Sequence, residues 1–268
     1  MFRRYRYLIF RRFLQISLLS LYVLGNYTSI KILQGNLSSS LVLGIVPLSD
    51  PFAVLQLFFS GAIVGSSALF GAMLIALFYG VFAGRAYCAY VCPINLITDF
   101  AAFLRRIFGI DVLGNMVHLS NNLRYALLVL GLGLSVIFGI AAFEAVSPIA
   151  MMHRGIIFGA GIGFFSVLVV FLLDLFIVKN AFCGKICPLG AFYALLGRFA
   201  ILKVKYNLES CTHCLECKVI CPQKQVLELI GKQSGLVTSG ECTRCGRCIE
   251  VCGDNALKFS LLEFAKEK

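Results

Sequence analysis

The stretch CTHCLECKVICP (residues 211–222) holds four cysteines in the order Cys-x2-Cys-x2-Cys-x3-Cys, and a proline follows the last of them. The stretch CTRCGRCIEVCG (residues 242–253) repeats the order with glycine in place of that proline. All twelve cysteines of the 268-residue chain fall into these two runs and into two shorter pairs upstream. Disulfide frameworks belong to small secreted chains, whereas tight clusters in a larger protein indicate metal or redox ligands. The cysteines are therefore interpreted as ligands.

The two runs have the ligand spacing of bacterial ferredoxins with two [4Fe-4S] clusters, in which the fourth cysteine of each run binds the other cluster. Zinc is the rival occupant of any Cys-x2-Cys pair, but two tandem copies with a three-residue last step favour iron–sulfur clusters. We expect residues 206–268 to form a small, cytoplasmic α+β ferredoxin-like domain around them. The predicted ligand sets are Cys211, Cys214, Cys217 and Cys252 for the first cluster, and Cys242, Cys245, Cys248 and Cys221 for the second.

Two Cys-x3-Cys-Pro pairs lie upstream, in YCAYVCPINL (residues 87–96) and FCGKICPLGA (residues 182–191). Cysteines four apart share one face of a helix, and a proline after the second fits the start of the next helix. The pairs Cys88/Cys92 and Cys183/Cys187 admit three interpretations. They jointly bind a metal ion or a further cluster, they are redox-active dithiols, or they are inert buried side chains. Their position in duplicated motifs disfavours the third, and the sequence does not decide between the first two.

The chain is too apolar for an ordinary soluble domain, with 59% hydrophobic and 14% charged residues. A bilayer core takes about 20 apolar residues. Segment 41–63 is interrupted by prolines and an aspartate, and we interpret it as re-entrant or interfacial. Residues 1–205 are thus predicted to be a four-helix membrane domain. The four runs long enough to span are residues 13–33, 64–83, 123–143 and 155–178.

The net charge of +11 lies entirely in residues 1–205, because residues 206–268 carry eight basic and eight acidic residues. The basic residues gather before the first apolar run, between the second and third, and after the fourth. By the positive-inside rule both termini are cytoplasmic. Charge placed between apolar runs in this way indicates membrane topology rather than a nucleic-acid surface.

Residues 76–107 align with residues 171–202 at an offset of 95, so the chain consists of two similar halves of two helices each. Both halves would start on the cytoplasmic side, which makes them parallel repeats about an axis along the membrane normal. Such an axis would bring the two cysteine pairs together near the cytoplasmic face. The predicted fold is mostly α, with four transmembrane helices and the small C-terminal α+β domain.

With four spans, two Cys-x3-Cys-Pro motifs and a terminal pair of ferredoxin motifs, the chain resembles the NapH family of membrane iron–sulfur proteins. The similar segments extend over nearly the whole length and include GNLSSSLV (residues 35–42), VPLSDP (residues 46–51) and all the cysteine motifs. The resemblance implies a quinol dehydrogenase component of a periplasmic nitrate reductase system, located in the bacterial inner membrane. Electrons from menaquinol or ubiquinol would pass to a NapG-like periplasmic iron–sulfur partner, and the subunit would not act alone.

The predicted topology separates the cytoplasmic clusters from a periplasmic acceptor by a hydrocarbon core of about 30 Å. A relay within the membrane is then required, and the Cys-x3-Cys-Pro pairs are its candidates. The alternative from another class is a metal-handling assembly factor. In that alternative Cys88, Cys92, Cys183 and Cys187 bind or reduce copper.

Asp174 is the only acid inside a predicted span, nine residues before Cys183. A charge at this depth is costly and suggests a proton path or a pairing partner. Because quinol oxidation releases protons, Asp174 is the candidate proton relay, and a structural hydrogen bond between helices is the alternative.

Two further groups of charged or polar residues admit a functional or a plain interpretation. Glu144, His153 and Arg154, at the outer end of the third and fourth spans, could line a quinone headgroup site or be ordinary interfacial residues. Lys218, Arg244 and Arg247 lie close to the cluster cysteines in sequence, where they could tune the cluster potentials or face solvent.

Overall fold

The computed structural model describes residues 5–28, 32–109, 119–159, 161 and 163–261. The chain divides into two compact units. The first unit comprises Met1–Leu14, Leu77–Val91 and Tyr193–Lys268, and the second comprises Gln15–Ala76 and Cys92–Phe192. The cysteine-rich C-terminal segment therefore shares a unit with the start of the chain and with the segment that carries Cys88.

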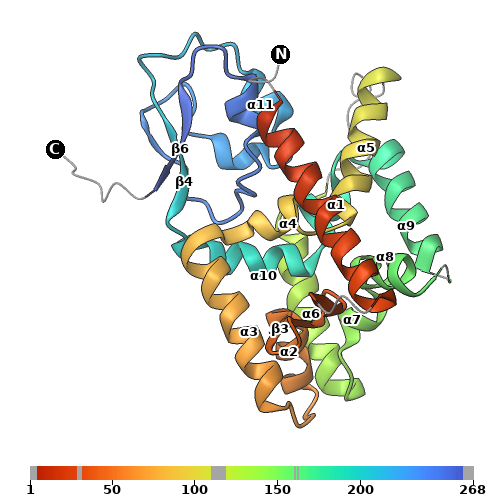
Figure 1. The fold of residues 1–268 in the computed structure, drawn as a ribbon. Coiled ribbons are helices and arrows are strands. Elements are labelled where there is room, and N and C mark those ends of the chain that lie inside the picture. Colours follow the sequence, from red (N-terminus) through yellow and green to blue (C-terminus); the bar gives the residue numbers. More distant parts are fainter. Residues whose placement is uncertain (1–4, 29–31, 110–118, 160, 162, 262–268) are drawn as a thin grey trace. The chain divides into compact units, whose positions relative to one another are not determined.

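The first unit contains an antiparallel sheet and two short helices (Figure 1). The sheet has the order β5-β4-β6, with β4 (Leu202–Tyr206), β5 (Gly235–Leu236) and β6 (Leu257–Leu261). Helix α11 (Glu216–Ile220) follows the first cysteines of one run and α12 (Arg247–Val251) those of the other. A 3-10 turn, η8 (Lys224–Leu227), lies between them. The α+β arrangement agrees with the prediction, and β4 extends across the predicted domain boundary at 205/206.

Alternation along β4 explains how this small sheet gains a core. Val204 and Tyr206 are buried, whereas Lys203 is half-buried and Lys205 is exposed. This alternation is expected because successive strand residues point to opposite faces. Cluster cysteines take part in the same core, since Cys217 and Cys248 are both buried there. The remaining buried members are Val204, Tyr206, Val226, Leu227, Ile230, Val237, Ile249, Ala256 and Leu257.

Two helices are long and apolar enough to cross a membrane. They are α1 (Arg6–Tyr27) and the helical stretch Ser66–Tyr90, which is kinked at Gly84 (φ 52°). This stretch comprises α3 (Ser66–Phe78), η2 (Tyr79–Ala83), η3 (Gly84–Ala86) and α4 (Tyr87–Tyr90). The third and fourth predicted spans contain the shorter apolar helices Leu123–Phe138 (α6) and Gly163–Ile177, the latter formed by α9 (Gly163–Leu172) and η5 (Leu173–Ile177). At 1.5 Å per residue these are about 24 and 22 Å long, less than the ~30 Å hydrocarbon core. Two helices of membrane length thus agree with the predicted membrane domain, and the number of spans remains a prediction.

The segment between the first two long helices is a small sheet followed by a short helix in the second unit. Strands β1 (Leu33–Gly35), β2 (Ser39–Val42) and β3 (Val46–Ser49) pair in sequence order. Helix α2 (Pro51–Phe59) begins after Asp50, whose side chain accepts the N–H of Phe52 and so caps the helix. Nine residues span only about 14 Å. Segment 41–63 is accordingly not a fifth transmembrane helix, as predicted.

The remaining elements of the second unit place the second cysteine pair. Helix α5 (Ile94–Ile107) packs against α9, η5 and α8 (Pro148–Phe158), and the rings of Phe100 and Phe171 stack at 6.0 Å. The short helix α7 (Ala142–Val146) connects α6 to α8. The turn η6 (Phe182–Ile186) carries Cys183, and α10 (Pro188–Leu196) follows it in the chain. The end of α10 and η7 (Gly197–Phe199) belong to the first unit.

Candidate metal centre

The two cysteine runs of the first unit have the same backbone course. His213 and Arg244, which occupy equivalent positions, have φ values of 60° and 51°. The next equivalent pair, Leu215 and Gly246, has φ values of 60° and 77°, and each precedes its five-residue helix. Left-handed residues bend the chain sharply, so each loop turns its first three cysteines around a common point.

The electrostatic neighbours of the thiols follow the crossed pattern of a two-cluster ferredoxin. Burial raises the pKa of Cys217, and the thiols that raise it further are Cys252, Cys214 and Cys211. Burial likewise raises the pKa of Cys221 to about 12, with Cys245 and Cys242 as its neighbouring thiols. The last cysteine of each run thus lies near the first cysteines of the other. The crossed ligand sets remain a prediction that this proximity supports.

The donor chemistry of these loops fits [4Fe-4S] clusters. Thiolates are the usual cluster ligands, four to a cubane, and each predicted set offers four cysteines. Within the described residues, no group of three or more His, Cys, Asp or Glu side chains could hold a single metal ion. The fit to [4Fe-4S] clusters therefore rests on the number and spacing of the cysteines.

The second Cys-x3-Cys-Pro pair is fixed by contacts within the second unit. The Cys183 thiol donates to Thr98 Oγ1 at 3.8 Å, and Cys187 Sγ accepts the N–H of Gly190 at 3.4 Å. Arg124 donates from Nη1 to the carbonyl of Gly184, between the two cysteines, at 3.1 Å. Cys187 is buried and Cys183 is half-buried. The thiols are thus held in a defined turn.

The first pair is divided between the two units. Cys88 belongs to the first unit and is half-buried, whereas Cys92 belongs to the second and is buried. The carbonyl of Cys92 accepts a hydrogen bond from Gln15 Nε2 at 3.3 Å. The four cysteines of the two pairs, Cys88, Cys92, Cys183 and Cys187, are called the membrane-edge cysteines below. Their convergence remains a prediction.

Asp174 lies beside the turn that carries Cys183. Its side chain is fully buried, Oδ1 accepts the N–H of Phe182 at 3.1 Å, and Oδ2 has no hydrogen-bond partner among the described residues. Arg105, also buried, donates from Nη1 to the carbonyls of Asp174 and Leu175 at 3.3 and 3.1 Å. The structure therefore brings Asp174 and the Cys183 turn together and leaves one carboxylate oxygen without a partner.

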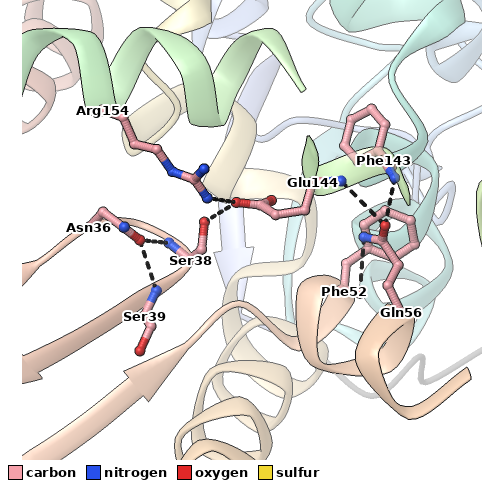
Figure 2. A network of polar contacts seen from close by, with 8 residues as sticks. All are labelled: Asn36, Ser38, Ser39, Phe52, Gln56, Phe143, Glu144 and Arg154. Carbon is pink, nitrogen blue, oxygen red and sulfur yellow. Dashed lines mark hydrogen bonds and ion pairs between the residues drawn. The ribbon is translucent and has the colours of Figure 1, made fainter. Parts of the chain in front are cut away.

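The polar residues at the predicted outer end separate into two environments. Glu144 accepts hydrogen bonds from Ser38 Oγ and from Arg154, whose Nη2 lies 3.0 Å away (Figure 2). His153 instead is buried edge-on against the ring of Tyr22 at 4.7 Å, and neither of its ring nitrogens has a hydrogen-bond partner among the described residues. The three residues do not form one polar cluster, and Glu144 and Arg154 have partners of their own.

Gln56 extends the same network, and its role was not predicted. Gln56 is fully buried and its Oε1 accepts the N–H groups of Phe143 and Glu144 at 2.8 and 3.3 Å (Figure 2). Its Nε2 donates to the carbonyl of Phe52 at 3.4 Å. A polar residue in the apolar segment 41–63 was the only sequence signal for this role.

Four buried arginines are the largest group that sequence reasoning missed. Arg11, Arg85, Arg105 and Arg124 are each at most 1% exposed, although their charge was used only to orient the helices. Three of them donate to backbone carbonyls far away in the chain: Arg85 to Glu241, Arg105 to Asp174 and Leu175, and Arg124 to Gly184. Of the basic residues near the cluster cysteines, Arg244 is also buried, whereas Lys218 and Arg247 are only partly buried.

Two family models match the chain, and their matches lie on the cysteine motifs. A model described as a 4Fe-4S binding domain matches twice, at residues 64–111 and 159–209, which contain the two Cys-x3-Cys-Pro pairs. A model described as a 4Fe-4S dicluster domain matches residues 203–253, which contain the two four-cysteine runs. The prediction of an iron–sulfur protein is confirmed. No solved structure matches the chain.

The chain is similar to ferredoxin-type proteins of several bacteria. It is 40% identical to the ferredoxin-type protein NapH of Haemophilus influenzae over 95% of this chain and 90% of that protein. It is 38% identical to the ferredoxin-type protein NapH of Escherichia coli over 96% of this chain and 90% of that protein. The methylamine utilization ferredoxin-type protein MauN of Paracoccus denitrificans is 43% identical over 89% of this chain and 84% of its own length.

Proposed function

Because the chain belongs to the family of ferredoxin-type proteins that includes NapH and MauN, we propose that it is the quinol-oxidising subunit of a membrane electron-transfer complex. In this proposal a menaquinol or ubiquinol gives two electrons to the protein and two protons to acceptors in it. The electrons leave towards a NapG-like periplasmic iron–sulfur partner and a nitrate reductase. The subunit acts within that complex and not alone.

The observation that carries the proposal is the combination, in one compact unit, of two ferredoxin cysteine runs with the Cys88 end of a membrane-length helix. A quinol is an apolar substrate of the bilayer, whereas ferredoxin loops belong to water-exposed domains. A protein that moves electrons between the two needs both parts in contact. The first unit supplies that combination.

The cluster ligands are proposed as the crossed sets of the two runs. Bound [4Fe-4S] clusters supply one-electron carriers. The chain's contribution is to hold each thiol in a turn, to shield Cys217 and Cys248 in an apolar core, and to keep Cys214 at the surface. Cys211, Cys214, Cys217 and Cys252 would hold one cluster, and Cys242, Cys245, Cys248 and Cys221 the other.

The membrane-edge cysteines are proposed as a third metal or redox site. Cys88, Cys92, Cys183 and Cys187 lie in segments that both match a 4Fe-4S binding model. The Cys183 turn is held by Thr98 and Arg124, as a site that must keep its shape requires. These cysteines would relay electrons between the quinol and the rest of the complex.

Asp174 is proposed to accept a proton that the quinol releases. Removing two electrons from a quinol also frees two protons, so a carboxylate near the relay is needed to accept them. The Asp174 Oδ2 atom has no partner among the described residues, and the carboxylate lies against the Cys183 turn. Asp174 would take one of the protons at that oxygen.

The proposed orientation is supported by the charge pattern, and the proposed partner by the names of the relatives. Both termini are proposed to be cytoplasmic, in the inner membrane, with four spans. Relatives of comparable identity carry the names NapH and MauN, so an acceptor of a methylamine-utilization system is the second candidate in place of nitrate reductase. Reporter fusions at residues 1, 50, 115, 150 and 268 test the orientation: activity of a periplasmic reporter at either terminus contradicts it.

The test of quinol oxidation uses anaerobically purified protein in lipid nanodiscs, with and without the periplasmic partner. A menaquinol analogue is added, reduction of the clusters is followed by EPR and visible bleaching, and iron is counted. We expect quinol-dependent reduction that is lost when Cys88, Cys92, Cys183 and Cys187 are changed to Ser, while dithionite still reduces the clusters. Iron beyond two cubanes, lost in the same variant, identifies a cluster at the membrane edge.

Two results contradict the proposal. One is an absence of reduction by quinol, with and without the partner, in protein whose clusters dithionite reduces. The other is stoichiometric copper binding at the four membrane-edge thiols in protein that does not react with quinol. The second result favours the metal-handling assembly factor.

A further inference from the structure

The two cysteine runs share a backbone course but differ in their surroundings. In the first run, all residues from Thr212 to Glu216 are exposed. At the equivalent positions of the second run, Arg244, Cys245 and Gly246 are buried. The domain therefore has one cluster loop at its surface and one covered by other segments of its unit.

One covering segment is the end of the membrane-length helix that carries Cys88. The Tyr90 hydroxyl donates to the carbonyl of Arg244 at 3.2 Å, and Arg85 Nη1 donates to the carbonyl of Glu241 at 3.4 Å. A Cβ on Gly84 would lie 1.9 Å from Arg244 Nη1, so the guanidinium rests directly on the Gly84 backbone. The second run is thus in contact with the helix turn of Cys88.

The other covering segment is the start of α1. Glu250, in the helix α12 within the second run, accepts the N–H groups of Tyr7 and Leu8 at 2.6 and 2.9 Å. A Cβ on Gly246 would lie 2.5 Å from Tyr7 Cγ, which means that the tyrosine ring packs on the glycine. A carboxylate is well placed at the first turn of a helix, where N–H groups lack partners.

Arg244 lies at the centre of this contact. It is 2% exposed, and its guanidinium donates from Nε to the carbonyl of Leu202, from Nη1 to that of Cys242 at 3.2 Å, and from Nη2 to that of Gly197 at 3.0 Å. Arginine keeps its charge in proteins. The structure therefore fixes a positive charge beside Cys242, out of water.

We propose that the second run is the side of the dicluster domain that faces the Cys88 helix end, and that Arg244 is the positioning residue that holds it there. Its use in electron transfer rests on the proposed function: electrons exchanged between the membrane segment and the domain would cross at the second run. The first run, with Cys214 exposed, is the side that faces water.

The proposal makes the two sites electrically unequal. Reduction adds negative charge to a cluster, and a nearby buried cation stabilises that state. The equivalent position in the first run is His213, which is exposed. Loss of Arg244 should therefore make the second site harder to reduce and leave the first unchanged.

The test is mediated redox titration of the full chain in nanodiscs, followed by EPR and compared among four variants. A water-soluble paramagnetic ion complex, which speeds the relaxation of exposed centres, distinguishes the two signals. Arg244→Gln removes the charge, Arg244→Lys keeps it without the planar fork, and Gly84→Ala displaces the guanidinium without removing it. His213→Arg is the matched control, because it puts the same group into the exposed run.

We expect one signal to respond to the soluble ion and the other to be protected from it. Arg244→Gln should lower the midpoint potential of the protected signal. The expected shift corresponds to a roughly tenfold change in the reduction equilibrium, which is 59 mV for one electron. Gly84→Ala should move the same signal, and Arg244→Lys should move it less. His213→Arg should affect only the relaxed signal, and weakly, because water screens an exposed charge.

The proposal is overturned if both signals respond equally to the soluble ion, or if Arg244→Gln shifts the relaxed signal or neither one. If Arg244→Gln loses its iron, Gly84→Ala, which displaces the guanidinium without removing it, decides by the same criterion. The titration uses chemical mediators and needs neither quinol nor a partner. A failure of quinol oxidation would therefore leave this result intact, and the reverse also holds.

Discussion

Asp174 accepts a hydrogen bond from the backbone N–H of Phe182, the residue immediately before Cys183. At an offset of 95 the equivalent residues are Tyr79 and Tyr87, and their rings meet edge-on at 5.8 Å immediately before Cys88. Each half of the chain thus connects its apolar helix to the start of its cysteine pair through the same two positions. In the first half the connection is aromatic, and in the second half it is a carboxylate.

Substitution of Asp174 separates proton transfer from anchoring. Asp174→Asn keeps an oxygen for the Phe182 N–H but cannot accept a proton, whereas Asp174→Ala loses both. We expect Asn to lower the rate of quinol-driven cluster reduction by about 10²-fold or more, the size of a general-base contribution, with iron content unchanged. Ala should in addition lose metal or redox activity at the Cys183 turn. An Asn variant with normal rates would restrict Asp174 to the anchoring role.

Substitution of the last cysteine of each run tests the crossed ligand sets. Cys252 lies near Cys217, and Cys221 lies near Cys242 and Cys245. We expect Cys252→Ser to alter the EPR signal of the first run and Cys221→Ser that of the second, each changing the line shape or halving the iron of the dicluster domain. If each change instead affected its own run, the ligand sets would not cross.

Cluster uptake should be favoured by rising pH. Burial raises the pKa of Cys221 to about 12 and raises those of Cys217, Cys242 and Cys248. These thiols therefore hold their protons in the apo protein between pH 7 and 9, and each must release one to bind iron. Anaerobic reconstitution at pH 7, 8 and 9 should show tighter iron uptake at each step and measurable proton release. Uptake independent of pH would mean that the thiols are already ionised.

The spacing of the cysteines predicted the cluster-binding runs, the α+β domain and the family, because the ligands of such a site lie within a few neighbouring residues. It did not predict the partners of the buried arginines. Arg105 and Arg124 donate to carbonyls 69 and 60 residues away, and a backbone carbonyl leaves no residue-type signal in the sequence. Their charge was therefore attributed to membrane topology alone.

The length of the third apolar helix was overestimated, because the apolar run continues beyond the residue at which the helix ends. The third predicted span covers residues 123–143, but α6 ends at Phe138, where Gly139 takes a left-handed φ of 65°. Such a glycine ends helices routinely. Likewise β2 and β3 overlap the segment 41–63, in which prolines and an aspartate predicted only an interruption. Apolar composition reports the environment of a segment and not its hydrogen-bonding pattern.

Gln56 should be a structural residue of the second unit. Its Oε1 is the acceptor for two N–H groups at the start of α7, and a buried donor without a partner costs about 1–3 kcal/mol. We expect Gln56→Ala to lower the free energy of unfolding by an amount in that range, which thermal unfolding followed by circular dichroism in nanodiscs measures. Arg154→Ala is the control, because its exposed ion pair with Glu144 is worth about 1 kcal/mol or less. Equal effects of the two changes would contradict the assignment.

Glu250 should hold the first turn of α1 against the dicluster domain. Its carboxylate accepts the N–H groups of Tyr7 and Leu8, a capping contact worth about 1 kcal/mol. Hydrogen exchange at residues 7–10 should therefore be faster by about fivefold in Glu250→Ala, and by less in Glu250→Gln, which keeps an oxygen acceptor without the charge. Glu216 is an exposed acid in the helix α11 of the first run, and Glu216→Ala should leave this exchange unchanged. Since exchange depends on local opening, equal protection in the wild-type and Glu250→Ala proteins would mean that α1 is held by its apolar contacts alone.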